Sequence, residues 1–186
     1  MPSHMKWSAQ FFIWFPTRYL LPPGHTAGSI SLFNEAEGVL FSGDTLLEKI
    51  TPNPVAEFSL PDEYNGYCSV SRFSASLKSI IQMDITQVLP GHGPYFSHGQ
   101  GRATAILEHF NRRKQLVLNL MGDTALKTNS DGMTLLHLTR RMFPNLKEME
   151  LFLGLSEAYA YIQLLESESL IETWQEKAVC RCQLKH

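Results

Sequence analysis

Short apolar runs bounded by glycine or proline dominate the first half of the chain. Runs of this length and setting are typical of buried β-strands. They cover 18–21, 29–33, 38–42 and 85–89. The polar segment 34–38 predicts a hairpin turn, and apolar residues at three- and four-residue steps predict a helix over 67–81. A hairpin, a long loop, a helix and a strand make a layered unit of the α/β (α+β) class.

The pattern changes near residue 98, where helical periodicity replaces the short strands. The first helical stretch carries Ile106, Phe110 and Val117 on one face. A second stretch, 135–142, should end before Pro144, because proline cannot continue a helix.

A third helix and a hairpin complete the predicted tail. We expect Ser156 to cap this helix, with Glu157 in its first turn. Two β-type runs follow at 170–175 and 178–184. Three helices and a hairpin are in the order of a winged-helix module, and a plain helical cap on the first unit is the alternative.

The predicted domain organisation follows these changes of pattern. Residues 1–17 are expected to be a cloning remnant or a partial strand region. Residues 18–97 form the first unit, and residues 98–186 form a small helical winged-helix-like domain.

Composition and charge narrow the classes of protein. Hydrophobic residues make up 44 % of the 186 residues, which is typical of a globular protein. The net charge is −2, which argues against a general binder of polyanions. Residues 98–186 hold eleven basic and ten acidic side chains, which disfavours nucleic acid as a partner. No apolar run approaches the roughly 20 residues of a membrane span. Three cysteines make no disulfide framework, and no signal peptide is evident, so we expect a cytoplasmic protein.

Three loops carry the candidate chemistry. They are 23–29, 41–45 and 89–94, and each presents one imidazole or carboxylate beside a glycine at the end of an apolar strand. The side chains are His25, Asp44 and His92. Imidazole and carboxylate are ligands that Zn²⁺, Mn²⁺ or Fe accept, so the trio predicts a metal site.

These motifs resemble a known family. Gly24-His25-Thr26-Ala27-Gly28-Ser29, Phe41-Ser42-Gly43-Asp44 and Leu89-Pro90-Gly91-His92-Gly93 are similar to the C-terminal half of a metallo-β-lactamase-fold hydrolase. The hydroxyacylglutathione-hydrolase-like branch is the most similar. The tail, with His109, Arg112 and Arg113, resembles the winged-helix extension of some members.

The resemblance implies an αββα sandwich and a two-metal hydrolase. His25 would ligate the first ion, His92 the second, and Asp44 would bridge both as the catalytic carboxylate. The ions would be zinc, or manganese or iron. A bridging hydroxide would then hydrolyse a thioester, ester, lactone or phosphodiester of a small-molecule substrate.

The family's His-x-His-x-Asp-His loop has no counterpart in this sequence. About two ligands per metal would remain, so we expect low metal occupancy and little or no hydrolase activity from this chain alone. Half a sandwich would also expose an apolar sheet face. We expect a truncated portion of a longer protein, a homo-oligomer or swapped partner that covers the face, or poor folding. The alternative function is a non-catalytic binding module whose tail contacts protein or RNA.

Further residues are candidates for contacts around the metal site. Tyr64 and Tyr67, with Phe58 nearby, would either shape a substrate pocket or simply pack. Asn53 would touch substrate or serve loop structure between two prolines. Thr26 and Ser29 would hold the His25 loop by hydrogen bonds.

Overall fold

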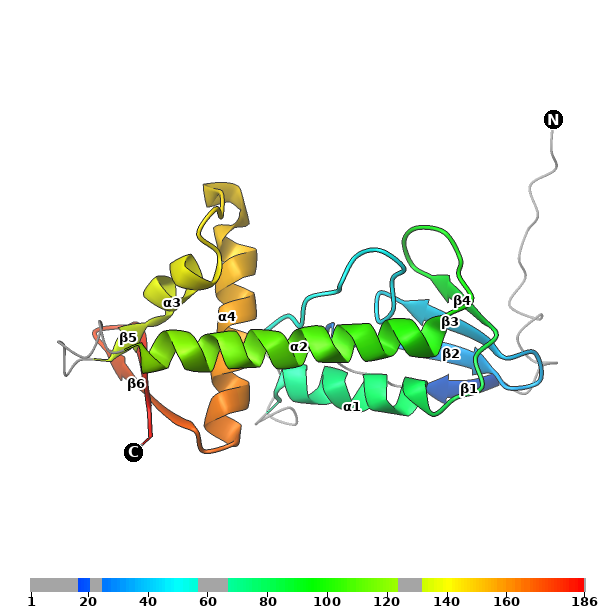
Figure 1. Ribbon diagram of the computed structural model, residues 1–186, viewed down its shortest axis with the longest axis horizontal. Helices are drawn as coiled ribbons and strands as arrows, with labels where there is room; N and C mark the ends of the chain where they lie inside the picture. The colour runs from blue at the N-terminus through cyan, green and yellow to red at the C-terminus, as the bar shows by residue number, and fades with distance from the viewer. Residues whose placement is uncertain (1–16, 21–24, 57–66, 124–131, 186) are drawn as a thin grey trace.

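Two small sheets are joined by a long helix in this mixed α/β protein (Figure 1). The computed structural model describes residues 17–20, 25–56, 67–123 and 132–185. The long helix, α2 (Gly99–Gly122), begins beside the four-stranded sheet and ends beside the three-stranded sheet. Within the described residues, no helix is long and apolar enough to cross a membrane.

The four-stranded sheet contains all four predicted strands in the order β1-β2-β3-β4. The first three pair antiparallel, and β4 returns parallel to β3 after helix α1 (Ser69–Ile81). The strands are β1 (Thr17–Leu20), β2 (Ser31–Asn34), β3 (Val39–Gly43) and β4 (Gln87–Pro90). The strand predictions and the helix prediction are all confirmed, and the ends of the elements differ from the predicted ends by one or two residues.

The predicted hairpin turn joins β2 to β3. The Asn34 side-chain oxygen accepts hydrogen bonds from the backbone N–H groups of Ala36 and Glu37. Gly38 closes the turn at φ +67°, where a side chain would be strained and would also meet Thr86.

The two faces of this sheet have different surroundings. Phe33, Leu40 and Val88 are buried in a core that includes both α1 and α2, whose Phe73 and Phe110 rings meet edge to face at 5.1 Å. Alternation turns Leu32 and Phe41, a directly opposed pair, to the other face. On that side Ile30 is 56 % exposed and Phe41 is 40 % exposed.

The tail contains the predicted helices and hairpin, with one strand that was not predicted. In chain order the elements are α2, β5 (Met133–Thr134), α3 (Leu135–Met142), the 3-10 turn η4 (Glu148–Glu150), α4 (Leu151–Ser167), β6 (Ile171–Glu176) and β7 (Val179–Leu184). The sheet order is β5-β7-β6. Two residues are too few for β5 to show an apolar pattern.

The prediction that Ser156 caps the third tail helix is wrong. Helix α4 begins at Leu151, after a turn in which the Glu150 carboxylate accepts from the Lys147 backbone N–H. Ser156 and Glu157 therefore lie inside the helix, and both are buried. The predicted stop before Pro144 is confirmed, because α3 ends at Met142.

The apolar core runs without a break from the first unit into the tail. One cluster includes Leu40 of β3, Phe110 of α2 and Leu165 of α4. The division at residue 98 therefore stays a prediction about domains, while α2 contributes to the packing on both sides of it.

Candidate metal site

Two of the three predicted ligands lie at one edge of the four-stranded sheet. Asp44 follows β3 directly, and His92 follows β4. Because these two strands are parallel neighbours, their ends meet at the same edge. The backbone N–H of Gly91 donates to the Gly43 carbonyl at 2.8 Å and ties the two loops together.

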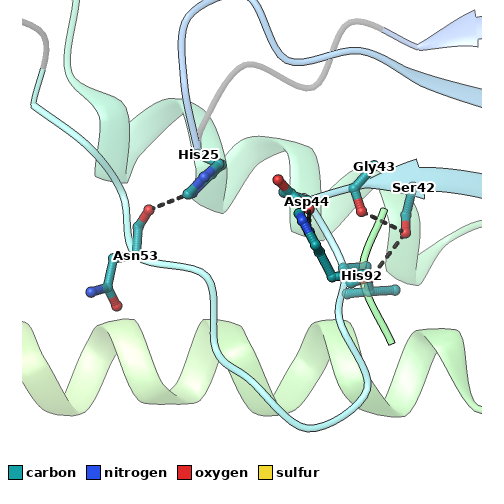
Figure 2. Close-up of polar contacts among 7 residues, drawn as sticks. His25, Ser42, Gly43, Asp44, Asn53 and His92 are labelled. Carbon is teal, nitrogen blue, oxygen red and sulfur yellow. Dashed lines mark hydrogen bonds and ion pairs between the residues drawn. The ribbon is translucent and has the colours of Figure 1, made fainter. Parts of the chain in front are cut away.

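Asp44 and His92 are in direct contact (Figure 2). His92 Nδ1 lies 2.7 Å from Asp44 Oδ1. A carboxylate can only accept, so Nδ1–H donates, and in the neutral form of the ring the lone pair is then on Nε2. The approach requires glycine at position 91, because a Cβ atom there would lie 2.8 Å from the same carboxylate oxygen.

His25 comes from the loop that precedes β2, and its ring is oriented by a backbone carbonyl. Its Nδ1 lies 2.8 Å from the carbonyl oxygen of Asn53. Since a carbonyl only accepts, Nδ1 carries a proton, and in the neutral form of the ring the lone pair is on Nε2. A ligand histidine is commonly oriented by this kind of hydrogen bond.

Thr26 and Ser29 close the His25 loop on itself. Their hydroxyl oxygens are 2.9 Å apart, and Ser29 Oγ also accepts from the Thr26 backbone N–H at 3.2 Å. The backbone N–H of Ser29 donates in turn to the Thr26 carbonyl. These bonds restrict the loop that carries His25.

The candidate substrate residues are placed only in part. Asn53 has an exposed side chain, and it is its backbone carbonyl that contacts His25. Tyr67 lies partly buried just before α1. Tyr64 and Phe58 lie outside the described residues. A substrate role for these residues stays a prediction.

The three predicted ligands do not form one compact group. Within the part of the chain that the structure describes, no three His, Cys, Asp or Glu side chains are close enough to hold one metal ion. In the view of Figure 2, Asp44 lies between His25 and His92, but only the Asp44–His92 pair is in contact. Two imidazoles and a carboxylate nevertheless have the donor chemistry of a zinc, manganese or iron site.

The residues that the family resemblance singled out on the first tail helix make their ion pairs and ring contact with other tail residues. His109 is partly buried on α2, where desolvation and then the cations of Arg113, Arg112 and Arg102 lower its pKa. Arg113 pairs with Glu157 at 2.9 Å, and Arg112 lies near Glu108. Arg113 therefore joins α2 to α4, and Arg112 lies on the exposed surface of α2.

Sequence reasoning missed the residues that support the site from the tail. Arg102 of α2 and Ser156 of α4 hydrogen bond to the loop that follows Asp44. Both residues contact backbone atoms that are far away in sequence, and such contacts leave no residue pattern to read.

Comparison with known proteins identifies the family. Residues 10–107, more than half of the chain, match the model of the Metallo-beta-lactamase superfamily. The chain belongs to this superfamily. It is 30 % identical over 154 residues to the "Probable metallo-hydrolase YqjP" of Bacillus subtilis, and 26 % identical over 114 residues to the "Beta-lactamase-like protein 2 homolog" of Caenorhabditis elegans.

The matches cover most of this chain but less than half of each relative. The alignment covers 83 % of this chain and 46 % of the Bacillus protein, and 61 % of this chain and 34 % of the Caenorhabditis protein. The chain thus spans less than half the length of these superfamily relatives.

Two solved structures share the fold. A metallo-beta-lactamase family protein from Thermus thermophilus matches with a TM-score of 0.73, and a beta-lactamase domain protein from Burkholderia ambifaria matches with 0.77. Both are 24 % identical; the matches cover 91 % and 92 % of this chain and 49 % of each neighbour. The predicted α/β fold class of this superfamily is confirmed.

Proposed function

We propose that this superfamily chain supplies His25, Asp44 and His92 to a two-metal centre of a metal-dependent hydrolase of the hydroxyacylglutathione-hydrolase-like branch. The observation that carries the proposal is the state of the two imidazoles. Each directs Nδ1–H to an oxygen, His25 to the Asn53 carbonyl and His92 to the Asp44 carboxylate. Both Nε2 atoms are therefore available as metal donors.

The donor set fits divalent zinc, with manganese or iron as the other candidates. When bound, such an ion acidifies water and polarises a carbonyl or phosphoryl oxygen, which is the chemistry of thioester, ester, lactone or phosphodiester hydrolysis. The chain's own residues would hold the ions and keep the ligand side chains oriented. Asp44 supplies a negative charge beside the His92 imidazole and would offset the charge of the cations.

Catalysis in this proposal requires a second sheet that the described residues do not provide. The chain spans less than half the length of these relatives, and Ile30 and Phe41 on one face of the sheet are exposed. We propose that a complementary sheet covers this face, from the same longer protein, from a second copy or from a swapped partner. We also place the protein in the cytoplasm.

The tail fits a winged-helix extension. Its element order, helix, short strand, helix, helix and hairpin, supports that assignment. A nucleic-acid-binding role gains no support, because α4 buries most of one long face against the core and its exposed last turn is acidic, with Glu166 and Glu168. The structure thus gives the binding-module alternative no specific observation in its favour.

Metal content tests the proposal. The chain would be loaded with Zn(II), dialysed, and measured by elemental analysis together with its mass in solution. We expect weak binding with partial occupancy, up to about one or two ions per chain, and its loss in His25→Ala, Asp44→Ala and His92→Ala. His137→Ala, which removes an exposed tail histidine, is the matched control and should retain them. Equal zinc in all four variants would contradict the proposal, as would a folded wild type that binds none.

Hydrolysis would then be assayed with one thioester, one ester, one lactone and one phosphodiester. Activity that follows zinc content across the same variants would support a catalytic role. A dimeric, zinc-loaded species with activity would point to a second copy as the source of the missing sheet.

A further inference from the structure

The loop that follows Asp44 is packed like part of the core although it has no regular structure. We call residues 45–56 the strap. Its first residues, Thr45, Leu46 and Leu47, are buried, and so are Pro52, Pro54 and Ala56 near its end. In Figure 2 the strap passes across helix α2, which lies in the lower part of the view. A buried loop must find partners for its backbone polar groups.

Two tail residues provide such partners. Arg102 of α2 donates from Nε to the Leu47 carbonyl at 2.7 Å and from Nη2 to Thr51 Oγ1 at 3.3 Å. Ser156 of α4 is buried, and its Oγ accepts from the backbone N–H of Ala56 at 3.0 Å. The strap is therefore fixed near its start, in its middle and at its end by residues of the tail helices.

The end of the strap in turn holds His25 at two points. The Val55 backbone N–H donates to the His25 carbonyl at 3.1 Å. The Asn53 carbonyl accepts from His25 Nδ1 at 2.8 Å. Asn53 lies between two prolines, and the proline that follows it confines its backbone to extended conformations. The position of the Asn53 carbonyl therefore depends on where the buried strap is anchored.

We propose that Arg102 and Ser156 are positioning residues for His25. By anchoring the strap they place the Asn53 carbonyl, which keeps the proton of His25 on Nδ1 and leaves Nε2 free. That the free Nε2 ligates a metal ion rests on the proposed function. That the tail sets the ring's tautomer and orientation does not.

A purely structural role for Arg102 and Ser156 makes a different prediction. Apolar burial of the strap alone would keep Asn53 in place, and loss of either tail hydrogen bond would lower stability without altering the His25 ring. The state of that ring therefore separates the two roles.

The decisive measurement is nitrogen-15 NMR of the histidine rings in the full, metal-free chain, with the His25 signals assigned from their loss in His25→Gln. The test variants are Arg102→Gln and Ser156→Ala. Arg112→Gln is the control, since Arg112 is an exposed arginine of the same helix whose ion-pair partner is Glu108. Arg102→Lys can restore the bond to the Leu47 carbonyl but not both bonds.

We expect wild type and Arg112→Gln to show His25 with a protonated Nδ1 and an unprotonated Nε2. Arg102→Gln and Ser156→Ala should each show a mixture of tautomers, and Arg102→Lys should lie between. Zinc affinity, measured by competition with a chromophoric chelator, should fall by about 10–100-fold in the two test variants. Circular dichroism establishes that each variant is folded, and Ser156→Ala serves if Arg102→Gln is not.

Unchanged His25 nitrogen shifts in a folded Arg102→Gln and a folded Ser156→Ala would overturn the proposal. So would an equal change in Arg112→Gln. If the tautomer changes as expected but the wild type binds no zinc, the positioning role stands and the proposed function fails.

Discussion

Removal of Glu157 from its ion pair with Arg113 should strongly destabilise the tail. The pair joins α2 to α4 with Nε and Oε1 2.9 Å apart, and the two side chains are only 14 % and 6 % exposed. The Arg113 guanidinium also lies 4.3 Å over the ring of Phe143. Glu157→Ala would leave this buried cation without its carboxylate.

The expected loss follows from that burial. Removing one partner of a buried pair costs about 3–5 kcal/mol, because the remaining charge stays desolvated. Arg113 Nη2 already lacks a hydrogen-bond partner among the described residues, so little else nearby can compensate. Glu108→Ala is the control: Glu108 and Arg112 are both well exposed and 3.9 Å apart, and such pairs contribute about 0.3–0.5 kcal/mol. Against a typical total of about 5–15 kcal/mol, the difference between the variants is large.

Urea unfolding of the full chain, followed by far-ultraviolet circular dichroism, would measure both losses. A Glu157→Ala loss below about 1 kcal/mol, close to that of the control, would refute the reasoning. Glu157→Gln keeps an oxygen that can accept from Arg113, so its loss should be smaller.

The pH dependence of Glu157→Gln gives an independent check. Burial raises the pKa of the Glu157 carboxyl, and the charge of Arg113 opposes this rise only in part. The folded chain then binds the proton more tightly than the unfolded chain does. The wild type should therefore lose stability as the pH rises from the ordinary carboxyl pKa through the raised value, and the glutamine variant should lack this loss. Parallel stability curves for the two proteins would contradict the raised pKa.

Three further predictions follow from glycine and cysteine positions. Gly91→Ala should weaken zinc binding by about 10–100-fold in chelator competition, because the new Cβ would lie 2.8 Å from an oxygen of Asp44. Gly38→Ala should lower the free energy of unfolding in urea by about 1–3 kcal/mol, since φ there is +67°. Burial raises the pKa of Cys182 to about 12, whereas Cys180 is less buried, so iodoacetamide should label Cys180 first in the native chain. Equal labelling of Cys180 and Cys182 in peptide mass spectrometry would contradict the cysteine prediction.

The sequence predicted the regular elements well because each depends on its own side chains. The strands β2, β3 and β4 are short apolar runs between turn residues, and α1 shows its buried face as a three- and four-residue period. Element ends moved by a residue or two, since hydrogen bonding to neighbours fixes them. The start of α4 was misplaced because Ser156 has the chemistry of a cap, while its partner is the Ala56 backbone, 100 residues away.

The candidate site was predictable in its residue types and not in its support. His25, Asp44 and His92 stand out because each is a metal-ligating side chain in a glycine-containing loop at a strand end. The contact that orients His25 and the contact that anchors Arg102 involve backbone atoms, the Asn53 carbonyl and the Leu47 carbonyl respectively. Every residue has a carbonyl, so its role becomes visible only when the chain path is known.

Helix α2 connects the tail to the candidate metal site. Near its start it carries Arg102, which fixes the strap, and three turns later it carries Arg113, which fixes α4. Helix α4 holds the other end of the strap through Ser156, the residue next to Glu157. Loss of the Arg113–Glu157 pair should therefore affect the position of His25 only through Ser156, since Arg102 would still donate to the Leu47 carbonyl. In the proposed arrangement, the tail of this superfamily chain therefore helps to position the candidate metal site.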